Sequence, residues 1–222
     1  MLSDMTELTW QGDVAIITMA QGENRFDLEE TMRWHALLDE VESHEGPLAL
    51  VTTGSDRFYS NGLNLDWLMA NQPEAGHMLR ELHRVWGRIL GLGCITVAAI
   101  NGHCFGAGAL LSSSHDRLVM RSDRGYWCMP ELDLGLPVSE KMAALLQARL
   151  PRTAIHRALM TAHRYTGAEA LAAGIVDELA EADAVLSTAV DWAAAIAPKS
   201  REVIAEHKRI LYGDLIASLT GR

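Results

Sequence analysis

The pattern of apolar and polar residues along the chain is of two kinds, which alternate: short apolar runs, and stretches in which apolar residues recur every three or four positions. Short apolar runs predict buried strands at 8–10, 14–19, 48–53, 95–100 and 118–120. Between these runs, apolar residues recur every three or four positions, which predicts amphipathic helices over 28–43, 74–91 and 107–114. In the first of these helices we expect Leu28, Met32, Leu38 and Val41 to share the buried face. The order of strands and helices predicts an α/β protein built from stacked ββα units.

From about residue 139 onward the pattern is mostly helical. Thr166 and Glu169 have the spacing of a capping box, in which each side chain satisfies a free backbone N–H of the other residue. Gly174 follows at the position where a helix often ends. This part of the chain therefore predicts a capped helix.

Pro198 separates two further predicted helices, 181–197 and 199–215. We divide the chain into a core of residues 1–195 and a C-terminal helix of residues 196–222. An alternative is that the whole helical end serves only as an oligomerisation or lid element added to a sheet core.

Composition narrows the class of protein. The 222 residues are enough for one large domain with a substantial core. A net charge of −10 argues against a general nucleic-acid binder, which would need a basic face. Cys94, Cys104 and Cys128 lack metal-ligand spacing, so we expect reduced thiols in a cytoplasmic protein. The segment 1–7 has two acidic residues and lacks the basic-then-apolar order of a secretion signal, so we predict no such signal. No apolar run is long enough for a membrane span.

Two glycine-rich turns each follow a predicted buried strand. The first is 58–65, which contains Gly62, and the second is 101–109, which contains Gly106 and Gly108. A glycine turn between a strand and a helix leaves backbone N–H groups free to face a ligand, and glycine allows close approach. One such turn is common in α/β proteins. Two of them predict a pair of donors converging on one oxygen, which is an oxyanion hole.

These turns and two later segments together resemble the crotonase (enoyl-CoA hydratase/isomerase) superfamily. The similar segments are 58–65, 98–116, 131–137 and 166–177, in family order, within a similarity that covers about residues 8–212. The resemblance implies a spiral of ββα units with a helical C-terminal region. It also implies that the N–H groups of Leu63 and Ala107 hold the thioester oxygen of an acyl-CoA.

One departure from the family pattern bears on the reaction. Hydratases of the family generally carry two glutamates, and the two positions here are Leu110 and Glu131. A single carboxylate with apolar neighbours suits a proton shuttle that moves a double bond from C3 to C2. The amino-acid sequences around Leu63 and Glu131 also resemble those of the Δ3,Δ2-enoyl-CoA isomerase branch. Burial would raise the pKa of Glu131 toward the working pH.

Other titratable residues remain alternatives near these motifs. Asp133 is the base if the alignment is shifted by two residues, since a strand would put it on the same face as Glu131. Asp116 fits a structural turn position. His103 and His115 flank the second turn, where a histidine more often orders the backbone than acts as a base.

Binding an anionic CoA to an acidic chain needs local positive charge. The resemblance places Arg25 on the CoA side of the pocket, and Lys199, Lys208 and Arg209 on a last helix that can reach a neighbouring subunit's ligand; each of these is otherwise a solvated surface charge. Trp67 stands near a position where the family often has a lysine. The substrate-binding set implied by the resemblance is Arg25, Gly62, Gly106, Gly108, Trp67 and Leu110.

An acyl tunnel lined by Met69, Met78, Leu82 and Trp86 is possible, although a helical apolar stripe is more often core. The resemblance implies a homo-oligomer, a trimer or a hexamer, but the C-terminus is shorter than in many relatives.

Three functions follow. The first is enoyl-CoA isomerisation by Glu131, the second is hydration or another enolate reaction, and the third is a catalytically weak oligomeric role. No metal or redox cofactor is expected, because no ligand cluster or dinucleotide fingerprint is present and coenzyme A is part of the substrate.

Overall fold

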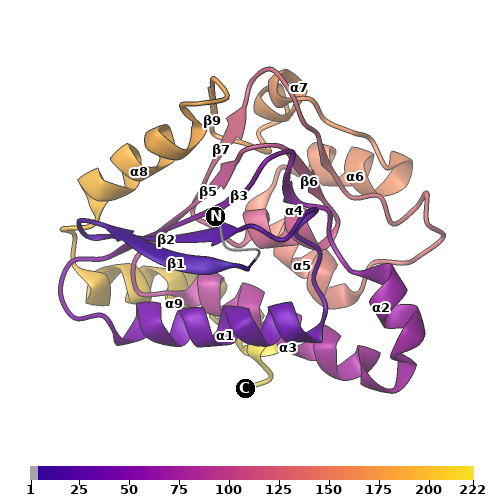
Figure 1. Cartoon of the computed structure of the whole chain (residues 1–222), viewed down its shortest axis with the longest axis horizontal. Coiled ribbons are helices and arrows are strands. Elements are labelled where there is room, and N and C mark those ends of the chain that lie inside the picture. Colours follow the sequence, from indigo (N-terminus) through magenta and orange to yellow (C-terminus); the bar gives the residue numbers. More distant parts are fainter. Residues whose placement is uncertain (1–4) are drawn as a thin grey trace.

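The computed structural model describes residues 5–222 as a mixed α/β fold (Figure 1). Residues 1–4 lie outside the described part. They include the start of the expected core of 1–195 and most of the segment 1–7, for which no secretion signal is predicted. The strands are β1 (Glu7–Gln11), β2 (Val14–Met19), β3 (Ala49–Gly54), β4 (Phe58–Ser60), β5 (Ile95–Ile100), β6 (His103–Phe105), β7 (Arg117–Arg121), β8 (Trp127–Cys128) and β9 (Glu178–Ala180). The helices are α1 (Leu28–Ser43), α2 (Leu65–Ala70), α3 (Gln72–Gly91), α4 (Ala107–Ser113), α5 (Glu140–Arg149), α6 (Arg152–Thr161), α7 (Gly167–Ala172), α8 (Val185–Ile196) and α9 (Arg201–Thr220).

The larger sheet has the strand order β1-β2-β3-β5-β7-β9. β1 and β2 form an antiparallel hairpin, and every other pair in this sheet is parallel. Parallel strands are buried on both faces, which explains why β3 and β5 read as continuous apolar runs in the sequence. Figure 1 shows α8 on one face of this sheet and α1 and α3 on the other. The strands and helices predicted from the apolar pattern are confirmed to within a few residues.

A second, smaller sheet has the order β4-β6-β8, and sequence analysis did not predict it. β4, β6 and β8 follow β3, β5 and β7 in turn, and a helix comes after each pair. This arrangement confirms the ββα units of the predicted crotonase-like spiral.

The passages from the larger sheet to the smaller one depend on glycine. A Cβ atom on Gly54 would lie 2.0 Å from the Phe58 carbonyl oxygen, and one on Gly102 would lie 2.1 Å from the Arg57 carbonyl oxygen. No side chain fits at either point, so the backbone at the start of β4 can pack directly against Gly54 at the end of β3 and against Gly102 just after β5. These crossings bring the two glycine turns to the same end of the fold.

One detail of the predicted helix over residues 28–43 is wrong. Met32 is 47% exposed, whereas Trp34, Leu38 and Val41 are buried. Met32 is two positions from Trp34, and residues two apart on a helix point to different faces. The N-cap Asp27 accepts a hydrogen bond from the Glu30 N–H and starts the helix where predicted.

The C-terminal helices begin and end near their predicted limits. Thr166 and Glu169 form the predicted capping box at the start of α7. α9 continues five residues beyond the predicted end at 215 and packs on α3 through glycine. A Cβ atom on Gly87 would lie 2.9 Å from the Leu219 Cβ atom. The division of the chain at residue 196 stays a prediction.

Within residues 5–222, every helix is too short or too polar to span a lipid bilayer.

Candidate active site

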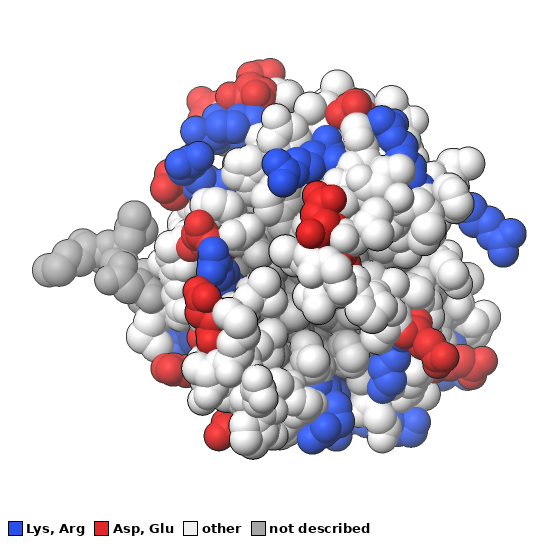
Figure 2. Space-filling model, turned by 90° about the vertical axis from the view of Figure 1, so that its right-hand side faces the viewer, with Lys and Arg blue, Asp and Glu red and all other residues white. Residues whose placement is uncertain are grey.

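The three predicted catalytic residues, Leu63, Ala107 and Glu131, border one cavity of about 410 Å³. Its walls come from both glycine turns, α2, α3, the segment 130–139 and the start of α5. They are formed by Asn61, Gly62, Leu63, Leu65, Leu68, Ala75, Leu79, His83, Gly106, Ala107, Pro130, Glu131, Leu134, Leu136, Pro137, Ser139 and Met142. Figure 2 shows the side of the molecule where α2 lies, with charged side chains mainly around the margin of a largely uncharged area. The cavity therefore combines apolar walls with a few polar groups, as small-molecule sites usually do.

The first turn is held in place by the loop that carries Arg25. The Phe26 N–H donates to the Gly62 carbonyl oxygen at 2.8 Å, and the Asn64 N–H donates to the Phe26 carbonyl oxygen at 2.8 Å. These two bonds flank Leu63 and leave its own N–H without an acceptor among residues 5–222. Gly62 has a φ of +84°, a value that favours glycine.

The second turn leads from β6 into α4. The Gly106 N–H donates to the Cys128 carbonyl oxygen at 3.0 Å, which ties the turn to β8. Gly106 has a φ of +52° and precedes Ala107, the first residue of α4. The Ala107 N–H, like that of Leu63, has no acceptor in the described part of the chain.

The two turns are packed directly on each other. A Cβ atom on Gly62 would lie 3.3 Å from the Ala107 nitrogen, and one on Gly108 would lie 2.7 Å from the Ser60 Cβ atom. The Ser60 hydroxyl accepts a hydrogen bond from the Gly62 N–H at 3.1 Å. The glycines thus allow the contact that brings the Leu63 and Ala107 amides to one cavity, a pair of donors able to bind one oxygen.

Glu131 borders the same cavity from the segment after β8. Its Oε2 atom is buried and has no hydrogen-bond partner in the described structure. Burial raises the pKa of the Glu131 carboxyl above its ordinary value of 4.5. Among the described residues that line the cavity, Glu131 is the one carboxylic acid. An unpartnered carboxyl beside free N–H donors can accept and return a proton from a bound molecule.

Asp133, the alternative base, is exposed and is not part of the cavity wall. The reason is local geometry: residues 131–135 form a turn, in which the Leu134 and Leu136 N–H groups both donate to the Glu131 carbonyl oxygen. The strand assumed for that alternative is absent at this place, so alternation cannot bring Asp133 to the same face as Glu131.

Four residues of the predicted substrate-binding set do not border the cavity: Arg25, Gly108, Trp67 and Leu110. Leu110 is fully buried in the core, behind Ala107 on α4. Trp67 on α2 is half-buried and packs against the core. Gly108 contacts Ser60 and acts on the site through the packing of the turns. Gly62 and Gly106 line the cavity directly.

The neighbouring histidines and Asp116 have structural contacts. His115 is buried between the Leu111 carbonyl oxygen and the Thr52 hydroxyl, and burial lowers its pKa to about 4. His103 packs among aromatic rings of the smaller sheet. Asp116 accepts hydrogen bonds from the backbone N–H and the hydroxyl of Thr96 at 2.8 and 3.0 Å.

The basic residues considered for CoA differ in accessibility. Arg25 lies beside the first turn but pairs with Glu23 at 2.5 Å and Asp66 at 3.7 Å. Lys208 is buried, at 2.7 Å from an Asp116 oxygen, so it is not available to a phosphate. Its helix brings it into the core opposite Asp116, a tertiary contact that the pattern of charges does not reveal.

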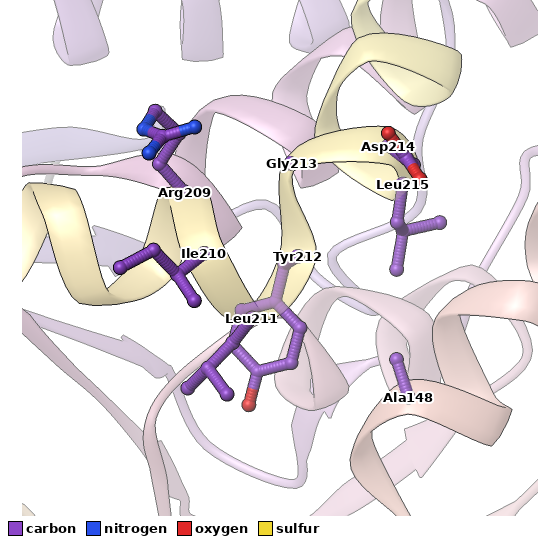
Figure 3. A pocket seen from close by; sticks show the side chains of 8 residues that line it. All are labelled: Ala148, Arg209, Ile210, Leu211, Tyr212, Gly213, Asp214 and Leu215. Carbon is purple, nitrogen blue, oxygen red and sulfur yellow. The ribbon is translucent and has the colours of Figure 1, made fainter.

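Lys199 and Arg209 are exposed, and Arg209 pairs with Glu206 on its own helix at 2.6 Å. Figure 3 shows Arg209 pointing away from the side of α9 on which Leu211 and Tyr212 lie. A hollow of about 740 Å³ surrounds these residues, between α9 and Ala148 of α5. None of the residues that line the cavity with Glu131 borders it.

Sequence reasoning missed His83, which lines the cavity on α3. In the sequence His83 follows Leu79 by four positions and precedes Trp86 by three on an otherwise apolar face, a pattern that does not separate a core histidine from one at a cavity. None of the four expected acyl-tunnel residues lines the cavity: Met78, Leu82 and Trp86 are buried in the core, and Met69 is 66% exposed.

Comparisons with known proteins show which family the chain resembles. Residues 9–219 match the model of a family described as enoyl-CoA hydratase/isomerase. Enoyl-CoA delta isomerase 3 of Arabidopsis thaliana is 33% identical, over 95% of this chain and 93% of its own length. Enoyl-CoA delta isomerase 2, a peroxisomal protein of the same plant, is also 33% identical, over 97% of this chain and 95% of its own length. A solved structure described as an enoyl-CoA isomerase of Mycobacterium tuberculosis is 28% identical and superposes with a TM-score of 0.89, covering 99% of this chain and 96% of that one.

Proposed function

Because the chain belongs to the enoyl-CoA hydratase/isomerase family, we propose that it is an enoyl-CoA isomerase that moves a double bond from C3 to C2 of an acyl-CoA thioester. The observation that carries this proposal is the pairing of one unpartnered carboxyl, on Glu131, with two free backbone N–H groups at the same cavity. The names of the Arabidopsis relatives support isomerisation within the family.

The proposed reaction needs one proton acceptor and one site for negative charge. The Glu131 carboxylate removes a proton from C2 of the 3-enoyl thioester, and the electron pair moves onto the thioester oxygen as an enolate. The N–H groups of Leu63 and Ala107 donate to that oxygen; each such donor is typically worth about 2.7–4 kcal/mol of barrier. The same carboxyl then returns the proton to C4, which leaves the double bond at C2 and the enzyme unchanged.

The walls around Glu131 favour proton return over water addition. Leu63, Leu65, Leu79 and Leu136 border the cavity, and the position at which hydratases of the family carry another glutamate is Leu110, which is buried. Water addition is helped by a group that orients the water in addition to the one that handles the proton at C2. Among the described wall residues, no second carboxylate is present to orient water.

The test compares two substrates. Purified protein should convert 3-enoyl-CoA to 2-enoyl-CoA, and it should form little 3-hydroxyacyl-CoA from 2-enoyl-CoA in water. Glu131→Gln should lower isomerisation by about 10²–10⁴-fold, the range expected for losing a general base. Asp133→Asn is the matched control, because Asp133 is exposed two residues away and should leave turnover unchanged.

Hydration or another enolate reaction is the alternative, and it uses the same residues. Efficient formation of 3-hydroxyacyl-CoA that depends on Glu131 would favour it over isomerisation. A protein that binds acyl-CoA yet turns over neither substrate would fit the catalytically weak oligomeric role.

The proposal includes the partner molecule. Coenzyme A enters as part of the substrate, and the steps above call on backbone amides and one carboxyl without a metal or redox group. Arg25 stays our proposed contact on the CoA side, since its loop is bonded to the first turn. Arg25→Ala should raise the Kd for CoA itself while leaving kcat nearly unchanged.

We also propose a homo-oligomer, a trimer or a hexamer. Support comes from α9, where Ile210 and Leu211 are 64% and 68% exposed beside the hollow of Figure 3. Exposed apolar side chains that lie together commonly mark an interface. Light scattering on the purified protein gives the mass directly, and a monomer would contradict the proposal.

The compartment is a further proposal. Cys94, Cys104 and Cys128 are all free and buried, which suits a reducing environment such as the cytoplasm. One of the Arabidopsis relatives is named as peroxisomal, so localisation of a tagged full-length protein in its own cells is the deciding measurement.

A further inference from the structure

One face of α3 forms a wall of the cavity and ends on a polar side chain. Ala75, Leu79 and His83 are four residues apart, so they lie on one face of the helix, and all three line the cavity. At 1.5 Å per residue they span about 12 Å along the helix axis. Ala75 and Leu79 offer carbon atoms to a ligand, and His83 offers an imidazole.

His83 packs against Trp86 and has no hydrogen-bond partner in the described part of the chain. Its ring centroid lies 5.2 Å from that of Trp86, at an angle of 46° between the planes. Neither ring nitrogen has a partner there, both keep some accessible surface, and the residue lines the cavity. The imidazole is thus available to a molecule in the cavity.

The imidazole of His83 is uncharged at neutral pH. Burial, and then the nearby Lys141 ammonium, lower the pKa of His83 to about 4. A neutral imidazole has one N–H donor and one nitrogen acceptor, so it bonds equally well to a hydroxyl or a carbonyl group. It carries no positive charge that would favour an anionic group over a neutral one.

A plain hydrocarbon chain would leave this ring without a partner. An unpaired polar group in an apolar, dehydrated place costs free energy, whereas a leucine or methionine there would contact the chain favourably. We propose that the pocket selects acyl chains that carry a hydroxyl or keto oxygen, which hydrogen-bonds to His83. This inference rests on the proposed function, because it takes the cavity to hold the acyl group of a CoA thioester.

The test separates binding from turnover by using saturated acyl-CoAs, which cannot isomerise. A panel of medium-chain acyl-CoAs, each with one hydroxyl or keto group at a different carbon beyond C4, is compared by calorimetry with the unsubstituted chain. At least one oxygenated member should bind about tenfold more tightly than the plain chain, the gain expected when a buried polar group obtains its partner.

His83→Leu should reverse that preference, so that the plain chain binds as tightly as the oxygenated one or more tightly. His83→Gln keeps a donor and an acceptor and should restore part of the preference. His77→Leu, on an exposed turn of the same helix outside the cavity wall, is the matched control and should change neither Kd.

Two results would overturn the inference: equal Kd values for plain and oxygenated chains in the unaltered protein, or a preference that survives His83→Leu. The first comparison uses only the unaltered protein, so it decides even if the variants fail to fold. Absence of isomerase turnover with every 3-enoyl-CoA would instead remove the proposed function, and the Kd comparison would still report on His83.

Discussion

The Oε1 atom of Glu131 lies 3.3 Å from the point that a Cβ atom would occupy on Gly106. Gly106 is the residue immediately before the Ala107 amide, so carboxyl and amide face the same small space with no side chain between them. The backbone of Gly106, with a φ of +52°, is also one that other residues rarely adopt.

Gly106→Ala should therefore damage catalysis more than folding. The new methyl group meets Glu131 and shifts either the carboxyl or the turn, and a displacement of that size commonly costs about 10²-fold in kcat. Gly12→Ala is a fair control, because Gly12 also has a positive φ, +58°, with nothing within 4 Å of its Cβ position. Both variants should lose stability in urea unfolding, and Gly12→Ala should retain its kcat.

Ala107→Pro should remove one proposed donor while sparing the helix. Proline lacks the N–H and is well tolerated at the first position of a helix, which Ala107 occupies in α4. We expect kcat to fall by about 10²–10³-fold, with far-UV circular dichroism unchanged. Full activity in a folded variant would mean that this amide does not hold the oxygen.

The pH profile of isomerisation should follow the ionisation of Glu131. The carboxyl must be deprotonated to accept a proton from C2, and burial raises its pKa above 4.5. Activity is therefore present at higher pH and is lost as pH falls through that raised pKa. A plot of kcat/KM against pH should show an acid limb with its midpoint above 4.5, and Asp133→Asn should leave the limb in place. A midpoint at or below 4.5 would contradict the assigned environment.

Lys208 should matter for stability and not for ligand affinity. Its Nζ atom lies 2.7 Å from an Asp116 oxygen and donates to the Cys94 carbonyl oxygen at 2.8 Å. Lys208→Met leaves Asp116 without its counter-charge and should lower the free energy of unfolding by about 3 kcal/mol. Lys199→Ala, at an exposed position near the start of α9, should change it by less than about 0.5 kcal/mol. Calorimetry with an acyl-CoA should give the same Kd for the Lys208 variant as for the unaltered protein.

Glu30 should make the protein less stable as pH rises toward neutrality. Its side chain is buried, and burial raises its pKa to about 7 although Thr6 and Trp34 donate to its Oε1 atom. The folded state therefore holds a proton that the unfolded state releases above about pH 4.5. The stabilisation is full below that value and is lost as pH approaches 7, by about 3 kcal/mol. Urea unfolding of Glu30→Gln, compared with the unaltered protein at both ends of this range, should show a weaker dependence on pH; identical slopes would refute the assignment.

The strands of the larger sheet could be predicted from the sequence, whereas those of the smaller sheet could not. The strands from Val14 to Met19 and from Ile95 to Ile100 have six residues each and are buried on both faces, so the sequence shows each of them as a mainly apolar run. β4, β6 and β8 have three residues or fewer, and no period can be read from so short a segment.

The same contrast holds at the candidate site. Glu131 and the two glycine turns can be proposed from the sequence because each lies in a run of consecutive residues that resembles a family segment. His83 and the Lys208–Asp116 pair were not assigned correctly, because each depends on which residues from distant parts of the chain come to face one another. A lone histidine on an apolar helical face is ordinarily core, and only the cavity beside it shows otherwise.

The close packing of α9 on α3 links the end of the chain to the cavity. Gly87 faces Leu219 and Gly91 faces Ile216, and His83 comes one helical turn before Gly87. The last helix thus packs on the same face of α3 that lines the cavity, starting one helical turn beyond His83. A change in the size of Leu219 or Ile216 can therefore shift α3 and alter which ligands the cavity binds, although neither residue contacts the ligand.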